Sequence, residues 1–293
     1  MPRVRLVVAF LALFAMALAG CGGGNEPSGG GGDNASPNEA VAAAATKTSD
    51  AGSSRVSFTI EMTDVGSQPV RMTGDGLFDS KTREGRMTMD LSQLGQAAGA
   101  QLGKAQVVFQ DFTLYMKFPF LRQLQPNLKP WLKFDLQALG KQQGFDLGQL
   151  SQLNQGDPTQ ALAYLRGASS DTKKVGEEDV RGTQTTHYHM TVDLKKVAAN
   201  APPEQRKQVQ ASIDEIVSKT GVRQVPTDVW IDDDGLVRRI RIAYKDFQFT
   251  GSQKGDMTMT QELYDFGVEV NVSPPPADQV SDISDILNPA QTG

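Results

Sequence analysis

The stretch Arg55-Val56-Ser57-Phe58-Thr59-Ile60-Glu61-Met62 decides the fold class of this chain. Large apolar side chains occupy every second position, and polar or charged side chains lie between them. Alternation with period two is typical of a β-strand that buries one face and exposes the other. Because antiparallel sheets commonly pack one face on a core and leave the other in water, the stretch predicts a strand of an antiparallel sheet.

The same alternation recurs along most of the chain. It predicts further strands within residues 70–78, 87–91, 112–118, 183–194, 225–231, 236–244, 257–263 and 266–272. Asp232-Asp233-Asp234-Gly235 lies between two of them. Asp-Gly in such a place is typical of a hairpin turn, in which glycine supplies a positive φ. The alternating acidic spacing and distal Glu of a calcium-binding loop are missing from this stretch, so we interpret it as a turn.

Helix signals occur before, within and after the strands. Ser36-Pro37-Asn38-Glu39 has the form of a capping box with proline at the first helical position, which predicts a helix from Pro37 to about Ala51. A second helix is predicted from Pro202 to Thr220, where Ile213 and Ile216 recur at helical spacing. The segment from Leu136 to Leu165 predicts short helices and loops, with a helix start at Asp157-Pro158. The predicted fold is mainly β (α+β), a single strongly curved antiparallel sheet with helices on one side.

The N-terminus has the features of an export signal. Arg3 and Arg5 precede an apolar run from Leu6 to Leu18, which is too short to span a bilayer, and Leu18-Ala19-Gly20-Cys21 follows. This tetrapeptide is similar to the lipobox of bacterial lipoproteins, in which the cysteine is acylated and the signal is cut before it. We therefore expect a signal peptide at residues 1–20, a lipidated flexible tether at 21–35 and one domain at 36–293. The alternative is an ordinary secretory signal with an incidental cysteine.

The charge of the mature chain limits its partners. The 29 Lys and Arg residues less Arg3 and Arg5 leave 27 against 34 Asp and Glu, a net charge of −7 after cleavage. This balance argues against nucleic acid as a partner and against binding to anionic lipid by charge alone. We expect membrane association through a lipid on Cys21, on the extracytoplasmic face of the cell membrane, with envelope protein partners unidentified.

Catalytic and metal-binding patterns are weak in this sequence. The two histidines, His187 and His189, lie two residues apart on one face of a predicted strand. A His-x-His pair can bind zinc or copper, but the apolar register of this strand is taken by Tyr188, Met190 and Val192, which places the histidines on the opposite, solvated face. We predict surface or structural histidines, no catalytic residue, no metal and no cofactor. A metal-dependent enzyme that uses this pair is the competing hypothesis.

Methionine is concentrated in the predicted strands. All eight methionines beyond the signal fall there, at positions 62, 72, 87, 89, 116, 190, 257 and 259. Strands usually favour β-branched and aromatic residues, whereas unbranched methionine forms a wall that can repack around variable apolar guests. The alternative is a large core that methionines fill. Gly74 and Gly76, in register with Met72, are interpreted either as strand bends or as gaps left for a ligand.

The order of several segments resembles a known family, the LppX/LprA/LprF/LprG lipoproteins of actinobacteria, which are similar in fold to the lipoprotein carrier LolA. The resemblance rests on the following stretches: the lipobox ending in Cys21, the alanine-rich helix leading into Gly52-Ser53-Ser54-Arg55-Val56-Ser57-Phe58, the hairpin Val229 to Arg239, and the closing Phe266 to Pro275. The segment from Leu136 to Gly156 matches nothing in the family, so ligand specificity is not carried over.

The resemblance implies a half-barrel sheet whose concave side, lidded by helices, encloses an apolar cavity for the acyl chains of lipids or glycolipids. It implies a non-enzymatic carrier that moves such lipids across the cell envelope. The candidate lining residues are Phe58, Ile60, Met72, Met87, Met89, Leu114 and Met116 on strands, and Ile213 and Ile216 on the second helix. The alternative function is an envelope interaction or sensor lipoprotein with a filled core and no lipid ligand.

Overall fold

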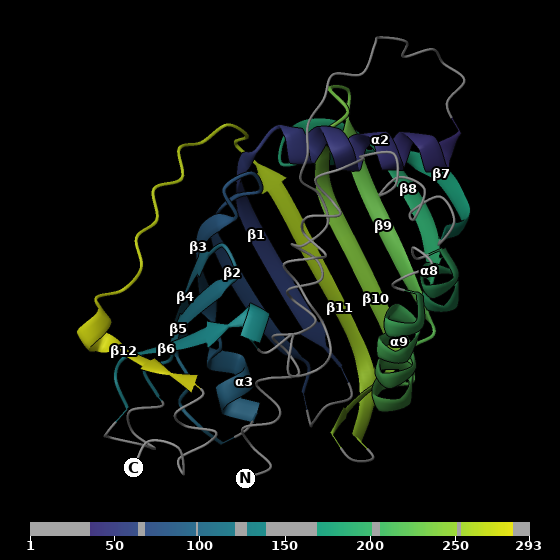
Figure 1. Ribbon diagram of the computed structural model, residues 1–293. Helices are drawn as coiled ribbons and strands as arrows, with labels where there is room; N and C mark the ends of the chain where they lie inside the picture. Colours follow the sequence, from purple (N-terminus) through teal and green to yellow (C-terminus); the bar gives the residue numbers. More distant parts are fainter. Residues whose placement is uncertain are drawn as a thin grey trace. The chain divides into compact units, whose positions relative to one another are not determined.

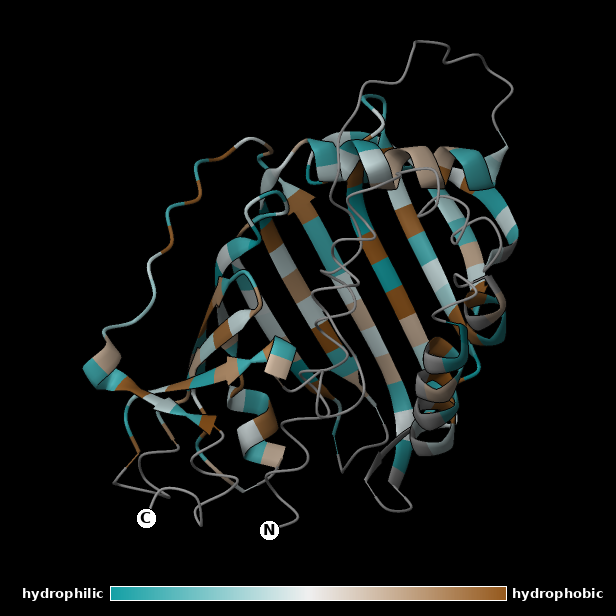
Figure 2. Cartoon of the chain, viewed as in Figure 1, coloured by the Kyte–Doolittle hydropathy of each residue, from teal (hydrophilic) through white to brown (hydrophobic). Residues whose placement is uncertain are grey.

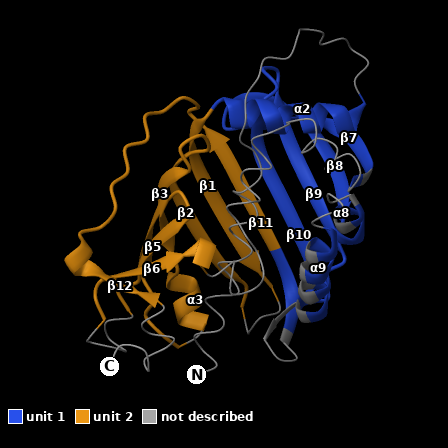
Figure 3. Cartoon of the chain, viewed as in Figure 1, with its two compact units in different colours: residues 1–51, 152–257 blue, residues 52–151, 258–293 orange. Residues whose placement is uncertain are grey.

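The computed structural model describes residues 36–63, 68–97, 99–120, 128–138, 169–200, 206–250 and 253–283. The predicted signal peptide, Cys21 and tether lie outside the described residues, as do the helix start at Asp157-Pro158 and most of the segment from Leu136 to Leu165. The chain divides into two compact units (Figure 3). Unit 1 comprises residues 1–51 and 152–257, and unit 2 comprises residues 52–151 and 258–293.

The described strands belong to one twelve-stranded sheet (Figure 1). Its strand order is β12-β6-β5-β4-β3-β2-β1-β11-β10-β9-β8-β7. The pairings whose register is defined are antiparallel except for β12 with β6, which is parallel. The predicted fold class, a single antiparallel sheet accompanied by helices, is therefore confirmed.

Unit 2 is built from consecutive antiparallel strands. Its elements are β1 (Ser53–Met62), β2 (Val70–Asp79), β3 (Glu84–Asp90), α3 (Ser92–Ala97), β4 (Lys104–Gln110), β5 (Thr113–Lys117), β6 (Trp131–Asp135), η1 (Ala277–Gln279) and β12 (Val280–Asp282). Strand β11 (Gln253–Tyr264) begins in unit 1 and ends in unit 2. The helix α3 is short and packs on β2.

In the described residues, unit 1 combines the remaining strands with three helices. Its elements are α2 (Pro37–Asp50), β7 (Ser169–Val180), β8 (Thr183–Asp193), α8 (Leu194–Asn200), α9 (Arg206–Thr220), β9 (Gln224–Asp232) and β10 (Val237–Thr250). Helices α8 and α9 pack on each other, and α9 also contacts β10. None of the helices in the described residues is long and apolar enough to cross a membrane.

The helix α2 begins where the capping signal predicts. The Ser36 hydroxyl accepts from the backbone N–H of Glu39, and the Glu39 carboxylate accepts from the Ser36 backbone N–H at 3.0 Å. Helix α2 runs across the ends of strands in unit 1 (Figure 1). The Thr48 hydroxyl accepts from the Val237 backbone N–H at 2.8 Å, which fixes the end of the helix on β10. Val41, Ala42 and Ala44 of this helix are buried.

The hairpin between β9 and β10 confirms the predicted turn at Asp232 to Gly235. Gly235 has a φ of +72°, and its backbone N–H donates to the Asp232 carbonyl at 2.9 Å. The Asp232 carboxylate accepts from the Leu236 backbone N–H at 2.8 Å and pairs with Arg238 at 2.5 Å. The carboxylate of Asp232 therefore holds the turn closed.

One predicted strand is wrong. Residues 266–272 do not form a strand, although their side chains still alternate between half-buried and exposed. Asp265 and Gly267 both have positive φ, so the chain turns sharply after β11. The Gly267 N–H donates to the Ser53 carbonyl and the Ser53 hydroxyl donates to the Val268 carbonyl, so the segment is tied to the first residue of β1 without continuing as a paired strand. The alternation marked which side chains are covered, but it carried no information about a pairing partner.

Candidate functional site

A continuous apolar face runs across β1 to β5 of unit 2. In antiparallel pairs, directly opposed residues project on the same side of the sheet, so the register assigns faces without ambiguity. Ile60 opposes Met72, and Phe58, Gly74, Met89 and Ala105 form one cross-strand row. A second row contains the following residues: Val56, Gly76, Met87, Val107, Met116 and Leu132. We call this side of the sheet the methionine face.

The seven strand residues predicted as cavity lining all lie on the methionine face. Leu114 completes the set through its register partners Phe109 and Phe134. All seven are buried except Met89, which is half-buried. Ile213 is buried in α9, and Ile216 belongs to the same helix. Their helix lies in unit 1 and the methionine face in unit 2, so a shared ligand cavity stays a prediction.

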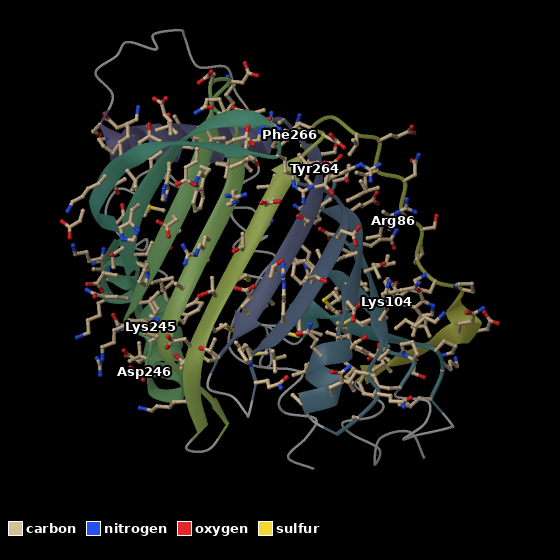
Figure 4. All side chains as sticks on the ribbon, turned by 180° about the vertical axis from the view of Figure 1, so that it is seen from behind. Arg86, Lys104, Lys245, Asp246, Tyr264 and Phe266 are labelled. Carbon is tan, nitrogen blue, oxygen red and sulfur yellow. The ribbon has the colours of Figure 1, made fainter. Side chains whose placement is uncertain are left out.

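The opposite side of the same strands is polar. Arg71, Thr88 and Lys117 lie there, as the period-two register predicts. Arg86 and Lys104 are exposed on this side, which Figure 4 shows from behind. Figure 2 displays the alternation as brown and pale or teal bands along the strands. A slip of one residue in β2, β3 or β5 would move its methionines to the polar side, so the sequence pattern strongly specifies the register.

The residue after Met89, at the end of β3, bonds to the first residue of α3. Asp90 follows Met89, and its carboxylate accepts from the Ser92 backbone N–H at 2.9 Å at the start of α3. Hydrogen bonds from the Ser92 hydroxyl and backbone N–H, helped by nearby Lys104, hold the pKa of Asp90 below its usual value. The Asp90 carboxylate therefore stays ionised, and keeps accepting from Ser92, under mildly acidic conditions.

The two histidines belong to a second cluster, in unit 1. They share one side of β8, as predicted, with Asp228 and Trp230 of β9 opposite them. The predicted surface or structural histidines differ in exposure: the His187 side chain is only 11% exposed, whereas that of His189 is 43% exposed. The reason is Trp230, whose ring stacks on the His187 ring at 4.2 Å between centroids. Sequence alternation alone could not reveal this aromatic cover.

Carboxylates surround both histidines. His187 contacts Glu178 through Nδ1 and Asp228 through Nε2, each at 3.0 Å, and His189 Nδ1 contacts the same Asp228 oxygen at 2.8 Å. Sequence reasoning identified neither carboxylate, because Glu178 and Asp228 approach only through strand pairing. Among the residues that the structure describes, no group of three or more His, Cys, Asp or Glu side chains is arranged to hold a metal ion.

Comparison with known proteins places the chain among Streptomyces relatives. It is 30% identical over 266 residues to an uncharacterized 31.2 kDa protein of Streptomyces griseus encoded in the rplA–rplJ intergenic region, a match that covers 86% of this chain and 81% of the relative. The chain belongs to the family of this protein. A second relative, named "Putative lipoprotein" in Streptomyces coelicolor, is 28% identical over 161 residues, which are 54% of this chain and 44% of that protein. No family model matches the chain.

Two mycobacterial lipoproteins are among the solved structures to which this chain is similar. LppX of Mycobacterium tuberculosis is 16% identical with a TM-score of 0.44, and the match covers 80% of this chain and 98% of LppX. LprF of Mycobacterium bovis is 13% identical with a TM-score of 0.43, covering 82% of this chain and 97% of LprF.

Proposed function

We propose that this family member is a non-enzymatic lipoprotein of the cell envelope that binds acyl chains of lipids or glycolipids at the methionine face and carries them across the envelope. In this proposal Cys21 bears the lipid anchor, and the domain faces outward from the cell membrane. The name of the Streptomyces coelicolor relative supports the lipoprotein assignment. Binding and release of an acyl chain require no catalytic residue.

The observation that carries the proposal is the concentration of methionine on one side of adjacent strands. Met72, Met87, Met89 and Met116 share this side, and Met62 extends it along β1. Methionine has three rotatable bonds and a polarizable thioether, so a wall of methionines can reshape around a flexible guest. Rigid β-branched side chains, which strands otherwise prefer, would suit one fixed packing partner.

Binding of an acyl chain to such a carrier can be reversible. Removing an acyl chain of about 16 carbons from water is worth on the order of 10 kcal/mol, at roughly 0.8 kcal/mol for each methylene. A chain that moves from a bilayer to an apolar protein face exchanges one apolar surrounding for another. The net change is therefore small, and loading and unloading can both proceed without an energy source.

A second candidate function follows from the burial of the same methionines. Met62 and Met116 are each only 1% exposed and are among the largest fully buried side chains of the described residues. Burial of this degree favours a filled core and an envelope interaction or sensor lipoprotein without a lipid ligand. Half-buried Met89, at the margin of the face, favours the carrier because a guest could enter beside it.

Native mass spectrometry of the full-length protein, extracted from the membranes of its own host, distinguishes the two functions. The carrier predicts additional lipid mass that collisional activation removes, whereas a covalent lipid on Cys21 remains bound. Lipid identified in the released fraction would define the ligand class. A spectrum that shows the covalently modified chain alone, across all activation energies, would contradict the carrier and support the filled core.

A further inference from the structure

Strand β7 ends the strand order of the sheet, so one side of its backbone has no strand neighbour among the described residues (Figure 1). A terminal strand presents backbone N–H and C=O groups to which another strand can pair. Strand β7 has twelve residues, and most of its described side chains are exposed. It is therefore long enough to accept a further strand if the side chains of that strand are compatible.

The charges on β7 are separated by sign. Lys173-Lys174 precedes Val175-Gly176, and Glu177-Glu178-Asp179 follows it. Charges of a single sign along an edge strand would repel a second copy of that strand. In an antiparallel pair of two β7 strands, the basic half of each copy instead opposes the acidic half of the other. A parallel pair in register would place like charges against each other, so the pattern favours the antiparallel arrangement.

An irregularity in β7 places Lys174 and Glu177 on the same side of the sheet. Residues three apart in a regular strand project on opposite sides. In the pairing with β8, however, Val175 is an extra residue, because its neighbours on either side have consecutive partners. The Lys174 ammonium group consequently lies 3.2 Å from the Glu177 carboxylate. Lys173 and Glu178 likewise share the other side, since their partners on β8 are four residues apart.

This arrangement of charges is complementary to itself about a two-fold axis. Directly opposed residues of an antiparallel pair project on the same side, and an axis normal to the sheet keeps each side chain on its own side. With the axis at Val175-Gly176, Lys174 opposes Glu177 of the second copy, and Lys173 opposes Glu178 of the second copy. Each of these opposite-charge pairs occurs twice and stabilises the contact.

The two residues at the axis fit the same arrangement. Among the described residues, Val175 is the one large apolar side chain that is strongly exposed, at 58%. In the pair of strands it opposes Gly176 of the second copy, where an added Cβ would meet nothing within 4 Å. The second copy would therefore cover an apolar side chain that water otherwise surrounds, and the glycine leaves room for it.

Contacts at the two ends of β7 limit the length of the pairing. At its start, the Ser169 and Thr172 hydroxyls bond to the side-chain oxygen of Asn38 in α2. At its end, the Asp179 carboxylate accepts from the Gly182 backbone N–H at 2.8 Å and holds the turn into β8. Residues 173–178 lie between these contacts and include both kinds of charge.

We propose that two copies of this chain associate through antiparallel pairing of residues 173–178 of β7, which joins unit 1 of each copy into one continuous sheet. The partner of this edge is thus a second copy of the chain, selected by its charge pattern. Because the paired segment is short and its charges stay partly solvated, the association is weak and is weakened further by salt. No residue of the methionine face takes part in this contact.

Sedimentation equilibrium of the full-length chain, extracted from host membranes in a nonionic detergent, measures the dimer dissociation constant. The wild type is expected to dimerise at concentrations between about 1 and 100 µM. Lys174→Glu sets like charges against each other at two symmetric positions and should raise the dissociation constant roughly tenfold, as should Glu177→Lys. The double variant Lys174→Glu/Glu177→Lys exchanges the charges and should return to within about threefold of the wild type. Lys254→Glu, the same charge change at an exposed residue outside β7, should have no effect.

Disulfide trapping in host membranes tests the register. Lys174→Cys and Glu177→Cys, carried by two copies with tags of different size, should link, because opposed Cα atoms of antiparallel strands lie about 4.5 to 5.5 Å apart. Asp171→Cys is the control, since position 171 would lie about 20 Å from position 174 of the second copy. The wild type, whose single cysteine is Cys21, gives the background.

The pairing of two β7 strands would be overturned by a wild type that stays monomeric at every concentration, or by a Lys174→Glu dimer as stable as that of the wild type. A double variant that remains as weak as the single variants would show that these residues do not oppose each other. Linking of the Lys174→Cys chain mainly to a different protein would assign the edge to another partner and equally overturn the proposal.

Discussion

The ring of Phe58 lies in the space that a side chain at position 74 would occupy. Phe58 and Gly74 are direct partners in the pairing of β1 with β2, so the glycine admits the aromatic ring between strands. At Gly76 the backbone carbonyl of Arg86 approaches just as closely. The two glycines of β2 are therefore close-approach positions, and neither leaves a gap for a ligand in this structure.

Gly74→Ala should destabilise the protein by about 1 to 3 kcal/mol, because the added methyl group overlaps both the Phe58 ring and the Thr88 carbonyl oxygen. Gly176→Ala is the matched control: it is also a strand glycine, and a methyl group there meets nothing within 4 Å. Equilibrium unfolding in urea measures both changes. Equal unfolding midpoints for the two variants would show that the Phe58 ring and the backbone at Thr88 can shift to make room for the added methyl group.

Asp232→Ala should cost about 3 to 5 kcal/mol of stability. The Asp232 side chain is 3% exposed, and its removal takes one acceptor away from both the Arg238 guanidinium and the Leu236 N–H. The exposed neighbour Asp233 supplies the control, since Asp233→Ala should stay within about 0.5 kcal/mol of the wild type. Thermal unfolding of the two variants, compared at one pH, checks the difference.

The sequence predicted the faces of the strands well, because each buried side chain contributes to a period-two pattern. Met87 and Met89 share a face away from Arg86 and Thr88, as the alternation indicates. Strand β7 escaped prediction for the opposite reason. It is an edge strand rich in charge, and its one large apolar side chain outside the core, Val175, is 58% exposed. Charged side chains on an edge strand prevent unwanted pairing with other strands. They also remove the alternation of apolar and polar residues from which a strand is predicted.

The end of β10 could not be predicted from alternation because the backbone turns at Asp246. Asp246 has a φ of +52°, and it projects with Lys245 on the side shown in Figure 4. Tyr244 and Phe247 are consequently both buried, with their rings 5.7 Å apart, although three positions separate them. The Lys245 ammonium group bonds to the Asp256 carboxylate and lowers the pKa of Asp256. The same carboxylate accepts from the Asp246 backbone N–H, which stabilises the turn at Asp246. A single positive φ thus breaks a pattern that holds elsewhere.

Alkaline pH should destabilise the protein through Tyr244. Burial raises the pKa of the Tyr244 hydroxyl above its ordinary value of about 10. The unfolded chain releases this proton at a lower pH than the folded chain does. The stability that comes from the protonated Tyr244 hydroxyl is therefore fully present below about pH 10 and is lost as the pH rises beyond it. Between about pH 8 and pH 11, the unfolding free energy should fall less steeply for Tyr244→Phe than for the wild type. The same change in Tyr188→Phe, at a half-buried tyrosine, serves as the control. If the unfolding free energy of Tyr244→Phe falls with pH as steeply as that of the wild type, other groups cause the loss of stability.

Cys21→Ala should move the protein from the membrane fraction to the medium. The lipobox interpretation makes Cys21 the site of acylation, and two or more acyl chains would bind the membrane nearly permanently. Labelling with a palmitate analogue, followed by fractionation, tests the assignment. Cys21→Ser should behave in the same way, because a hydroxyl does not replace the thiol in this modification. Label retained by Cys21→Ala in the membrane would rule out Cys21 as the lipidation site.

Tryptophan substitutions on the methionine face should separate lipid binding from stability if the face accommodates a guest. Met89 is half-buried, so Met89→Trp is expected to occupy space used by an acyl chain while the melting temperature stays near that of the wild type. Met116 is 1% exposed, and Met116→Trp is expected to overpack its surroundings and cost about 1 to 3 kcal/mol or more. Met72 is 5% exposed, so the loss of stability in Met72→Trp is expected to lie between those of the other two variants.

Thr88→Trp is the matched control for this series, since Thr88 neighbours both methionines of β3 and projects from the opposite side of the sheet. Its lipid content and melting temperature should both stay close to the wild type. Lipid released from each variant is quantified by mass spectrometry, and melting is followed by circular dichroism. Loss of lipid by Met89→Trp with near-native melting supports the carrier. The indole then fills space that the lipid uses and that no other side chain occupies. A large melting loss in all three methionine variants, with no lipid bound by the wild type, makes the filled-core interaction protein the better account.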